Sequence, residues 1–312
     1  MKRYSKVALL LLGAGIGAYY LFSNSFPSTL VYVRDNLAAV FFFDKVTVAT
    51  LQQKYAATYP DQKKIKIVIV PGHEPDYGGT LYKNLKERDM NVALADKLAS
   101  ELEADPHFDI TQSRDEQTWN PELSRYFSDH WEDIKIWMKQ QKLIMQTLID
   151  NNNIELAGQN PHASASPDVA VRLYGINRWA GDNDVDIIIH VHFNDYGSRK
   201  AGKAGRYSGL VIYVPERQYS NSLASRKIAE SIFKELNKEY ATSTSPIESS
   251  GVIEDQDLIA IGSHNTSDTA SMLIEYGYIY EPQFATESSR EKVFTDMAER
   301  TYRGLNNFFN AL

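Results

Sequence analysis

The chain has 312 residues, of which 43% are hydrophobic and 12% aromatic, enough apolar side chains to bury the core of a full domain. Its 33 basic and 40 acidic residues give a formal net charge of -7, a balance that argues against nucleic acid as a partner. The chain contains no cysteine, which excludes disulfides, thiolate metal sites and a cysteine nucleophile and leaves histidine and carboxylate as the strong metal ligands.

The N-terminus carries the pattern of an export signal. Basic residues at positions 2, 3 and 6 precede an apolar run over residues 7–22. Basic residues on this flank predict that the N-terminus stays cytoplasmic and that the remaining chain is exported. Residues 23–25 (Ser-Asn-Ser) offer a cleavage site, but the absence of Ala-x-Ala favours an uncleaved anchor. We therefore expect residues 1–23 to be a transmembrane signal-anchor, with the protein secreted only if this segment is cleaved.

Residues 24–63 are apolar in places but are interrupted by charged residues, among them Arg34, Asp35 and Asp44. Charges at this spacing argue against a second membrane span. We expect a juxtamembrane helix or stalk that ends in a polar, proline-containing linker.

From residue 64 to the C-terminus, short β-rich runs alternate with segments of helical periodicity. This alternation predicts an α/β fold with a mainly parallel sheet and helices on both faces. A final helix is expected from the capping-box pattern Ser288-x-x-Glu291 onward. The expected strands are residues 65–70, 108–111, 185–192, 210–214 and 272–275, and the clearest helices are residues 90–102 and 223–236.

One segment, residues 119–166, fits the alternation poorly. It holds a long helical pattern over residues 130–149 and then a polar stretch with proline. We interpret it as an insertion that packs on the domain, with a lid over a site as the alternative.

Three of the expected strands end in residues that can bind a metal or move a proton. The first leads into His73, the third ends at His192, and the last delivers Glu275. Ligands of open α/β sheets bind at the carboxyl ends of the strands, so these side chains should converge on one crevice.

A catalytic zinc takes three protein ligands and keeps one position for water. His73 and His192 supply imidazoles, and Glu87 supplies a carboxylate at the start of the following helix, where negative charge is favoured. Glu74 and Asp76 remain rival ligands.

Two further residues belong to this pattern. His190 lies two positions before His192 on the same face of the strand, and we interpret it as a core residue or a support for the ligand. Glu275 ends a buried run, where a carboxylate is costly unless it lies near a cation. Beside a metal-bound water it would act as the base and return the proton to the leaving amine.

Together these motifs resemble the zinc-dependent N-acetylmuramoyl-L-alanine amidase family over residues 64–312. The matching segments are Pro71-Gly72-His73 with Gly78-Gly79, Glu87 to Asn91, Ser113-Arg114-Asp115, His192-Phe193-Asn194, and Leu273 to Tyr278. The resemblance implies a phosphorylase/hydrolase-like three-layer fold, Zn²⁺ on His73, Glu87 and His192, and Glu275 as the catalytic base. The implied substrate is the amide between N-acetylmuramic acid and L-alanine in peptidoglycan, and Arg114 is implied to be structural.

The chain departs from the family pattern beside the ligands. Glu74 stands where glycine is usual, His190 replaces a small residue, and Phe193 replaces alanine. Asn194 and Asn265 are candidates for contacts to the substrate or to its oxyanion. His190 and Glu74 are grouped with them as residues that would contact the substrate or support the metal ligands.

Two alternatives stay open at this point. One is an exported zinc carboxypeptidase or peptidase acting on another amide, because fold does not fix substrate. The other is an inactive, membrane-tethered protein that binds the cell wall. The expected partners are peptidoglycan and, through residues 1–23, the cytoplasmic membrane, with the domain outside in the periplasm or cell wall; no sequence feature points to an activator protein.

Overall fold

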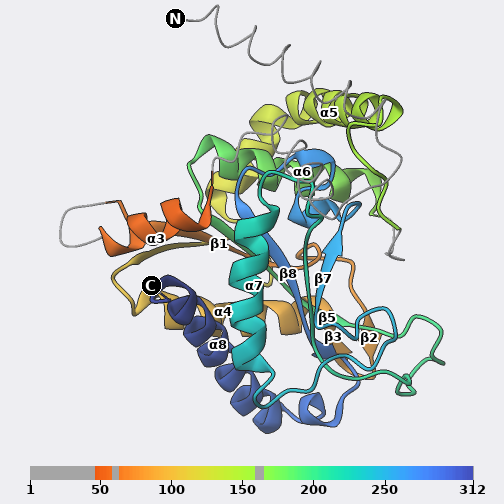
Figure 1. The fold of residues 1–312 in the computed structure, drawn as a ribbon. Coiled ribbons are helices and arrows are strands. Elements are labelled where there is room, and N and C mark those ends of the chain that lie inside the picture. The colour runs from red at the N-terminus through yellow and green to blue at the C-terminus, as the bar shows by residue number, and fades with distance from the viewer. Residues whose placement is uncertain (1–45, 58–62, 159–164, 312) are drawn as a thin grey trace, which may run out of the picture.

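The computed structural model describes residues 46–57, 63–158 and 165–311 (Figure 1). A six-stranded sheet with the order β4-β1-β5-β8-β6-β7 forms its centre, and a small hairpin of β2 and β3 lies apart. The strands are β1 (Ile65–Pro71), β2 (Leu81–Tyr82), β3 (Leu85–Lys86), β4 (Phe108–Gln112), β5 (Ile187–Asn194), β6 (Val211–Pro215), β7 (Val252–Asp255) and β8 (Ala270–Tyr278). The helices are α3 (Val48–Ala56), α4 (Glu87–Glu103), α5 (Pro121–Asp150), α6 (Pro167–Asp182), α7 (Ser222–Leu236) and α8 (Glu287–Phe309).

The sheet is mixed but mostly parallel. Strand β1 pairs in parallel with β4 and β5, β5 with β8, and β6 with β7, whereas β6 runs antiparallel to β8. The α/β prediction is confirmed, and all five expected strands are present. Strand β7, the hairpin and helix α6 were not predicted.

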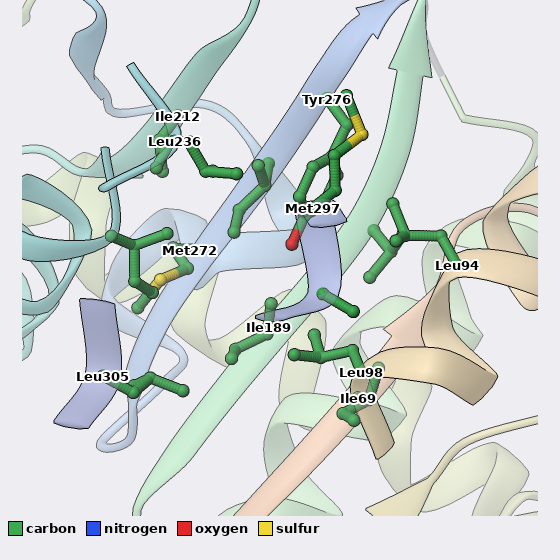
Figure 2. Packing of buried hydrophobic residues seen from close by; sticks show 14 of the residues in the cluster. Ile69, Leu94, Leu98, Ile189, Ile212, Leu236, Met272, Tyr276, Met297 and Leu305 are labelled. Carbon is green, nitrogen blue, oxygen red and sulfur yellow. The ribbon is translucent and has the colours of Figure 1, made fainter. Parts of the chain in front are cut away.

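Helices cover both faces of the sheet, which explains why its central strands are almost continuously apolar. On β5, Ile187 and Ile189 face the core shared with α4, α7 and α8. Ile188 faces the second core, built with α5 and α6. Figure 2 shows the first core, where Ile69, Ile189 and Met272 of the strands pack against helix residues such as Leu98 and Leu305.

Helix α5 forms the long helix expected within residues 119–166, but it begins at Pro121 and not at His130. The side chain of Asn120 accepts a hydrogen bond from the backbone N–H of Glu122, and proline occupies the first turn, where its missing N–H costs nothing. Buried residues of α5, among them Phe127 and Ile134, join the second core. The insertion therefore packs on the domain along α6.

Helix α8 begins at Glu287, capped by Thr286, whose side chain accepts from the N–H of Ser289. The predicted capping box at Ser288 and Glu291 is therefore wrong. Thr286 precedes the helix in an extended conformation, which is the backbone geometry of an N-cap.

Helix α3 covers part of the stretch expected to be a stalk. Its Leu51 is only 1% exposed, and Tyr55 stacks on Phe309 and His107 at centroid distances of 4.5 and 4.2 Å. Helix α3, within that stretch, thus packs on the domain. Within the described ranges, no helix combines the length and the apolar character that crossing a membrane requires. The expected signal-anchor at residues 1–23 lies outside the described residues.

Candidate metal centre

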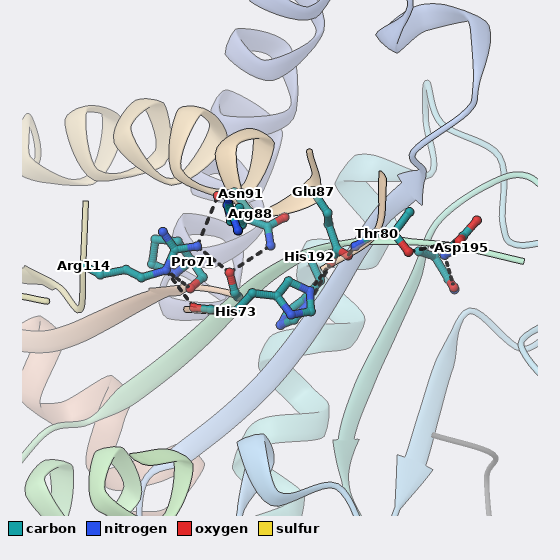
Figure 3. A network of polar contacts seen from close by, with 11 residues as sticks. Pro71, His73, Thr80, Glu87, Arg88, Asn91, Arg114, His192 and Asp195 are labelled. Atoms are coloured by element: carbon teal, nitrogen blue, oxygen red, sulfur yellow. Dashed lines mark hydrogen bonds and ion pairs between the residues drawn. The ribbon is translucent and has the colours of Figure 1, made fainter. Parts of the chain in front are cut away.

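The strands whose tips were predicted to converge, β1, β5 and β8, are neighbours in the sheet. His192 on β5 and Glu275 on β8 stand side by side in the parallel register. His73 lies in the loop just after β1, and Glu87 is the first residue of α4. Figure 3 shows His73 between Arg114 on one side and His192 and Glu87 on the other.

The candidate ligand atoms of His73, Glu87 and His192 all lie within 4.8 Å of one another. Oxygen Oε1 of Glu87 is 2.8 Å from Nε2 of His73 and 3.1 Å from Nδ1 of His192. Among the described residues, the Nε2 atom of His73 is buried and has no partner in hydrogen-bond geometry. Two imidazole nitrogens and a carboxylate oxygen that crowd one point fit a shared cation.

Glycines leave the space that the ligands occupy. A Cβ atom on Gly72 would lie 2.2 Å from the ring of His192, and one on Gly79 would lie 2.9 Å from Cδ2 of His73. Gly79 also has φ of +75°, a conformation that side chains disfavour. His73 itself adopts φ of 69°, so the loop after β1 turns sharply to present the imidazole.

Glu87 is held as a carboxylate. Its backbone N–H donates to the carbonyl of Thr80, and the N–H of Thr80 donates to its Oε2 at 2.9 Å. Burial alone would raise the pKa of Glu87, but the adjacent imidazoles of His192 and His73 lower it well below its usual range. Burial lowers the pKa of His192 despite its hydrogen bond to Glu87. A charged carboxylate and a neutral imidazole are the forms that bind metals.

Arg114 holds the backbone around the ligands. It is 1% exposed, and its guanidinium donates to the carbonyls of Pro71, Gly72, His73, Arg88 and Asp115 (Figure 3). It therefore ties the loop that carries His73 to the first turn of α4.

Glu275 differs from Glu87. Its Oε2 atom is buried without a hydrogen-bond partner among the described residues. Burial, followed by the charges of Glu87 and Glu248, raises its pKa well above the usual value. A carboxylate in this state needs a proton or a nearby cation, and the cluster beside it on β5 is where a cation would bind.

The other predicted residues are not part of this cluster, and Asn265, which precedes the start of β8, lies toward the opposite edge of the sheet. His190 is 1% exposed, and burial, then the nearby His192, lowers its pKa to about 3, so it is a neutral core residue. Glu74 is bound to helix α6 and to Trp119. Asn265 accepts from the backbone and hydroxyl of Ser220, and Asp76 is exposed.

One buried carboxylate beside the site was not predicted. Glu248 is 5% exposed and accepts hydrogen bonds from Asn194, Tyr213, Tyr278 and Ser243. It lies in a loop before β7 with no strand-end pattern, so the sequence carried no signal for it. Its bond to Asn194 orients that amide two residues beyond His192.

The fold and this cluster are those of an α/β protein with a candidate metal centre at the carboxyl edge of the sheet. A family model for N-acetylmuramoyl-L-alanine amidases matches residues 67–307. The chain therefore belongs to the N-acetylmuramoyl-L-alanine amidase family.

Solved amidase structures share the fold. The CwlD amidase from Clostridioides difficile, solved in complex with the GerS lipoprotein, has a TM-score of 0.51 at 15% identity, covering 80% of this chain and 100% of its own. Ami1 from Mycobacterium smegmatis has a TM-score of 0.51 at 13% identity, with the same coverage of 80% and 100%. No curated protein sequence matches this chain.

Proposed function

We propose that the protein is a zinc-dependent amidase that cleaves the bond between N-acetylmuramic acid and L-alanine in peptidoglycan. The observation that carries the proposal is the convergence of His73, Glu87 and His192 within 4.8 Å, with Glu275 beside His192 on the next strand. Two imidazoles and one carboxylate form a ligand set typical of catalytic zinc. The export pattern of residues 1–23 supports action outside the cytoplasmic membrane, where peptidoglycan lies.

A zinc ion bound there would polarise the scissile carbonyl and lower the pKa of water at the site. Glu275 then acts as the base, because it accepts the proton of the attacking water and returns it to the leaving nitrogen as the amide C–N bond breaks. The missing hydrogen-bond partner of its Oε2 leaves that atom available for the water. Arg114 and Thr80 hold His73 and Glu87 in place during the reaction.

The test compares the parent chain with Glu275→Gln and His192→Ala. We would measure bound zinc and then the masses of the products released from purified peptidoglycan. The parent should hold about one zinc per chain and release intact stem peptides that begin with a free L-alanine amine. Glu275→Gln should keep the zinc and lose roughly 100-fold or more of the rate, because it cannot accept the proton. His192→Ala should lose the zinc.

Other results would redirect the proposal. A parent that binds zinc but releases other fragments would be a peptidase on another exported amide. A parent that binds no zinc would contradict the proposal and leave a non-catalytic wall-binding protein.

A further inference from the structure

Glu74 follows His73 directly in the chain, yet its side chain is engaged elsewhere. The carboxylate is 4% exposed. Its Oε1 accepts from Nε of Arg172 on α6 at 2.8 Å, and its Oε2 accepts from Nε1 of Trp119 at 3.2 Å. Both oxygens therefore bind groups that belong to, or flank, the inserted segment.

The same contacts fix the loop that carries His73. The backbone N–H of Glu74 donates to the carbonyl of Tyr77 at 3.2 Å, and Arg172 donates to the Tyr77 hydroxyl at 3.4 Å. The guanidinium of Arg172 lies 5.6 Å from the ring centroid of Trp131 on α5. Residues 73–77 are thus attached to α6 and, through Arg172, indirectly to α5.

Charge gives Glu74 a second effect. It forms an ion pair with Arg172 and interacts electrostatically with the buried Arg114, and the side chains of both arginines are largely withdrawn from water. Two cations in a partly buried setting would oppose the binding of a divalent cation nearby. The negative charge of Glu74 offsets them, which a glycine at this position cannot do.

We infer that Glu74 is a positioning residue for the metal ligand His73. It clamps residues 73–77 onto α6 and Trp119, and its negative charge partly offsets the charges of Arg172 and Arg114 near the candidate metal centre. This inference rests on the proposed function, because it takes His73 to be a zinc ligand. Residues that support a metal ligand from outside typically change metal affinity by about 10- to 100-fold when mutated.

The experiment measures the zinc affinity of the full chain by competition with a chelator, alongside the thermal midpoint of the metal-free protein. Glu74→Gln should weaken zinc binding about 10- to 100-fold. The double variant Glu74→Gln/Arg172→Met should recover part of that loss, because it removes the uncompensated cation.

A matched control tests whether any buried carboxylate would behave in this way. Glu235 is 6% exposed and binds Lys238 and Asn307. It lies on α7, which covers the face of the sheet opposite α5 and α6. Glu235→Gln should lower the thermal midpoint and leave zinc affinity unchanged.

The outcomes separate the two proposals. If the parent binds zinc and Glu74→Gln binds it equally well, the positioning role is overturned while the amidase proposal stands. Equal losses of zinc affinity in Glu74→Gln and Glu235→Gln would likewise overturn it, since the effect would be general destabilisation. A parent without zinc affinity would reject both.

Discussion

Arg114 shows how a buried cation can organise a site without touching substrate. Its burial lowers its pKa to about 10, which still leaves it charged at neutral pH. A charged donor with a planar fork can bind several carbonyls that point in different directions, which a lysine cannot do. The loop after β1 leaves regular structure at Gly72 and His73, so its carbonyls need partners from outside the sheet. Arg114 supplies them.

His264 carries the clearest pH dependence among the residues away from the metal. Its imidazole receives a hydrogen bond from the Tyr174 hydroxyl, or donates one to it, at 2.8 Å. Burial, and then the charge of Lys142, lowers its pKa to about 4. In the unfolded chain the same group titrates near ~6.5. The unfolded state therefore binds the proton first, and folding stability is lost as the pH falls from about 6.5 to about 4.

The variant His264→Asn should remove this dependence, because asparagine tolerates the φ of 61° found at this position. Between pH 7 and about 4, the parent should lose roughly 1–2 kcal/mol more stability than the variant. Urea unfolding across that range measures the difference. His130→Asn, at a half-exposed position on α5, should keep the slope of the parent; if it flattens the slope equally, His264 is not the source.

At the residue scale, the convergence of the candidate ligands was predictable because each lies near the boundary of a recognisable element. His73 follows β1, His192 lies near the end of β5, and Glu87 opens a helix with the apolar spacing that follows it. The contacts around the candidate ligands were harder to predict from the sequence. Glu74 was a rival ligand by sequence position, but its partners Arg172 and Trp119 come from segments that only tertiary packing brings close.

At the element scale, helices α7 and α8 approach so closely that one position admits only glycine. A Cβ atom on Gly304 of α8 would lie 2.4 Å from the Cα of Ile232 on α7. Helix propensity alone predicts that alanine would stabilise this position by up to about 1 kcal/mol. The close backbone contact makes alanine destabilising instead, because α7 and α8 would have to move apart to admit its methyl group.

Gly304→Ala should therefore destabilise the fold by about 1–3 kcal/mol. Gly181 near the end of α6 is the matched control. Apart from its chain neighbours and its own helix backbone, no atom of the described residues lies within 4 Å of the place that an added methyl group would take. Gly181→Ala should be neutral or slightly stabilising. Thermal unfolding of both variants tests the contrast. A stabilised Gly304→Ala would contradict the close approach of α7 and α8.

The element boundaries show where sequence patterns were sufficient. Apolar periodicity located α4 and the five expected strands, but the start of α5 depended on Asn120 and Pro121, which precede the periodic stretch. Helix α8 followed the same rule, since Thr286 caps it two residues before the predicted box. Caps are set by backbone conformation as well as residue type, so the sequence pattern placed the start of α5 at His130 instead of Pro121 and the cap of α8 at Ser288 instead of Thr286.

At the scale of the whole molecule, the order of the strands was not predictable from the sequence. Strand β6 follows β5 in the chain, but β8 lies between them in the sheet. This arrangement places Glu275 beside His192. The proximity of Glu275 and His192 was predicted only from the general rule that the carboxyl ends of parallel strands lie at the same edge of the sheet.

Helix α3 extends the domain toward the N-terminus, at the end of the sheet opposite the candidate metal centre. It packs beside the start of β1, and Tyr55 lies between His107 and Phe309. The Tyr55 hydroxyl also donates to Asn306 at 3.2 Å. Without α3, the apolar surfaces of Phe309 and Phe108 would face water.

A chain that begins at residue 63 should therefore be less stable than one that begins at residue 46. Exposure of these apolar surfaces predicts a loss of about 3–5 kcal/mol and a thermal midpoint lower by roughly 10 °C. In the longer chain, Leu51→Ala should lower the folding stability by about 2–4 kcal/mol. Gln53→Ala, on the exposed side of α3, should leave the stability unchanged. Zinc affinity should be equal in the two chains at low temperature, because His73 lies at the far end of β1. Equal thermal midpoints would mean that α3 does not belong to the folded domain.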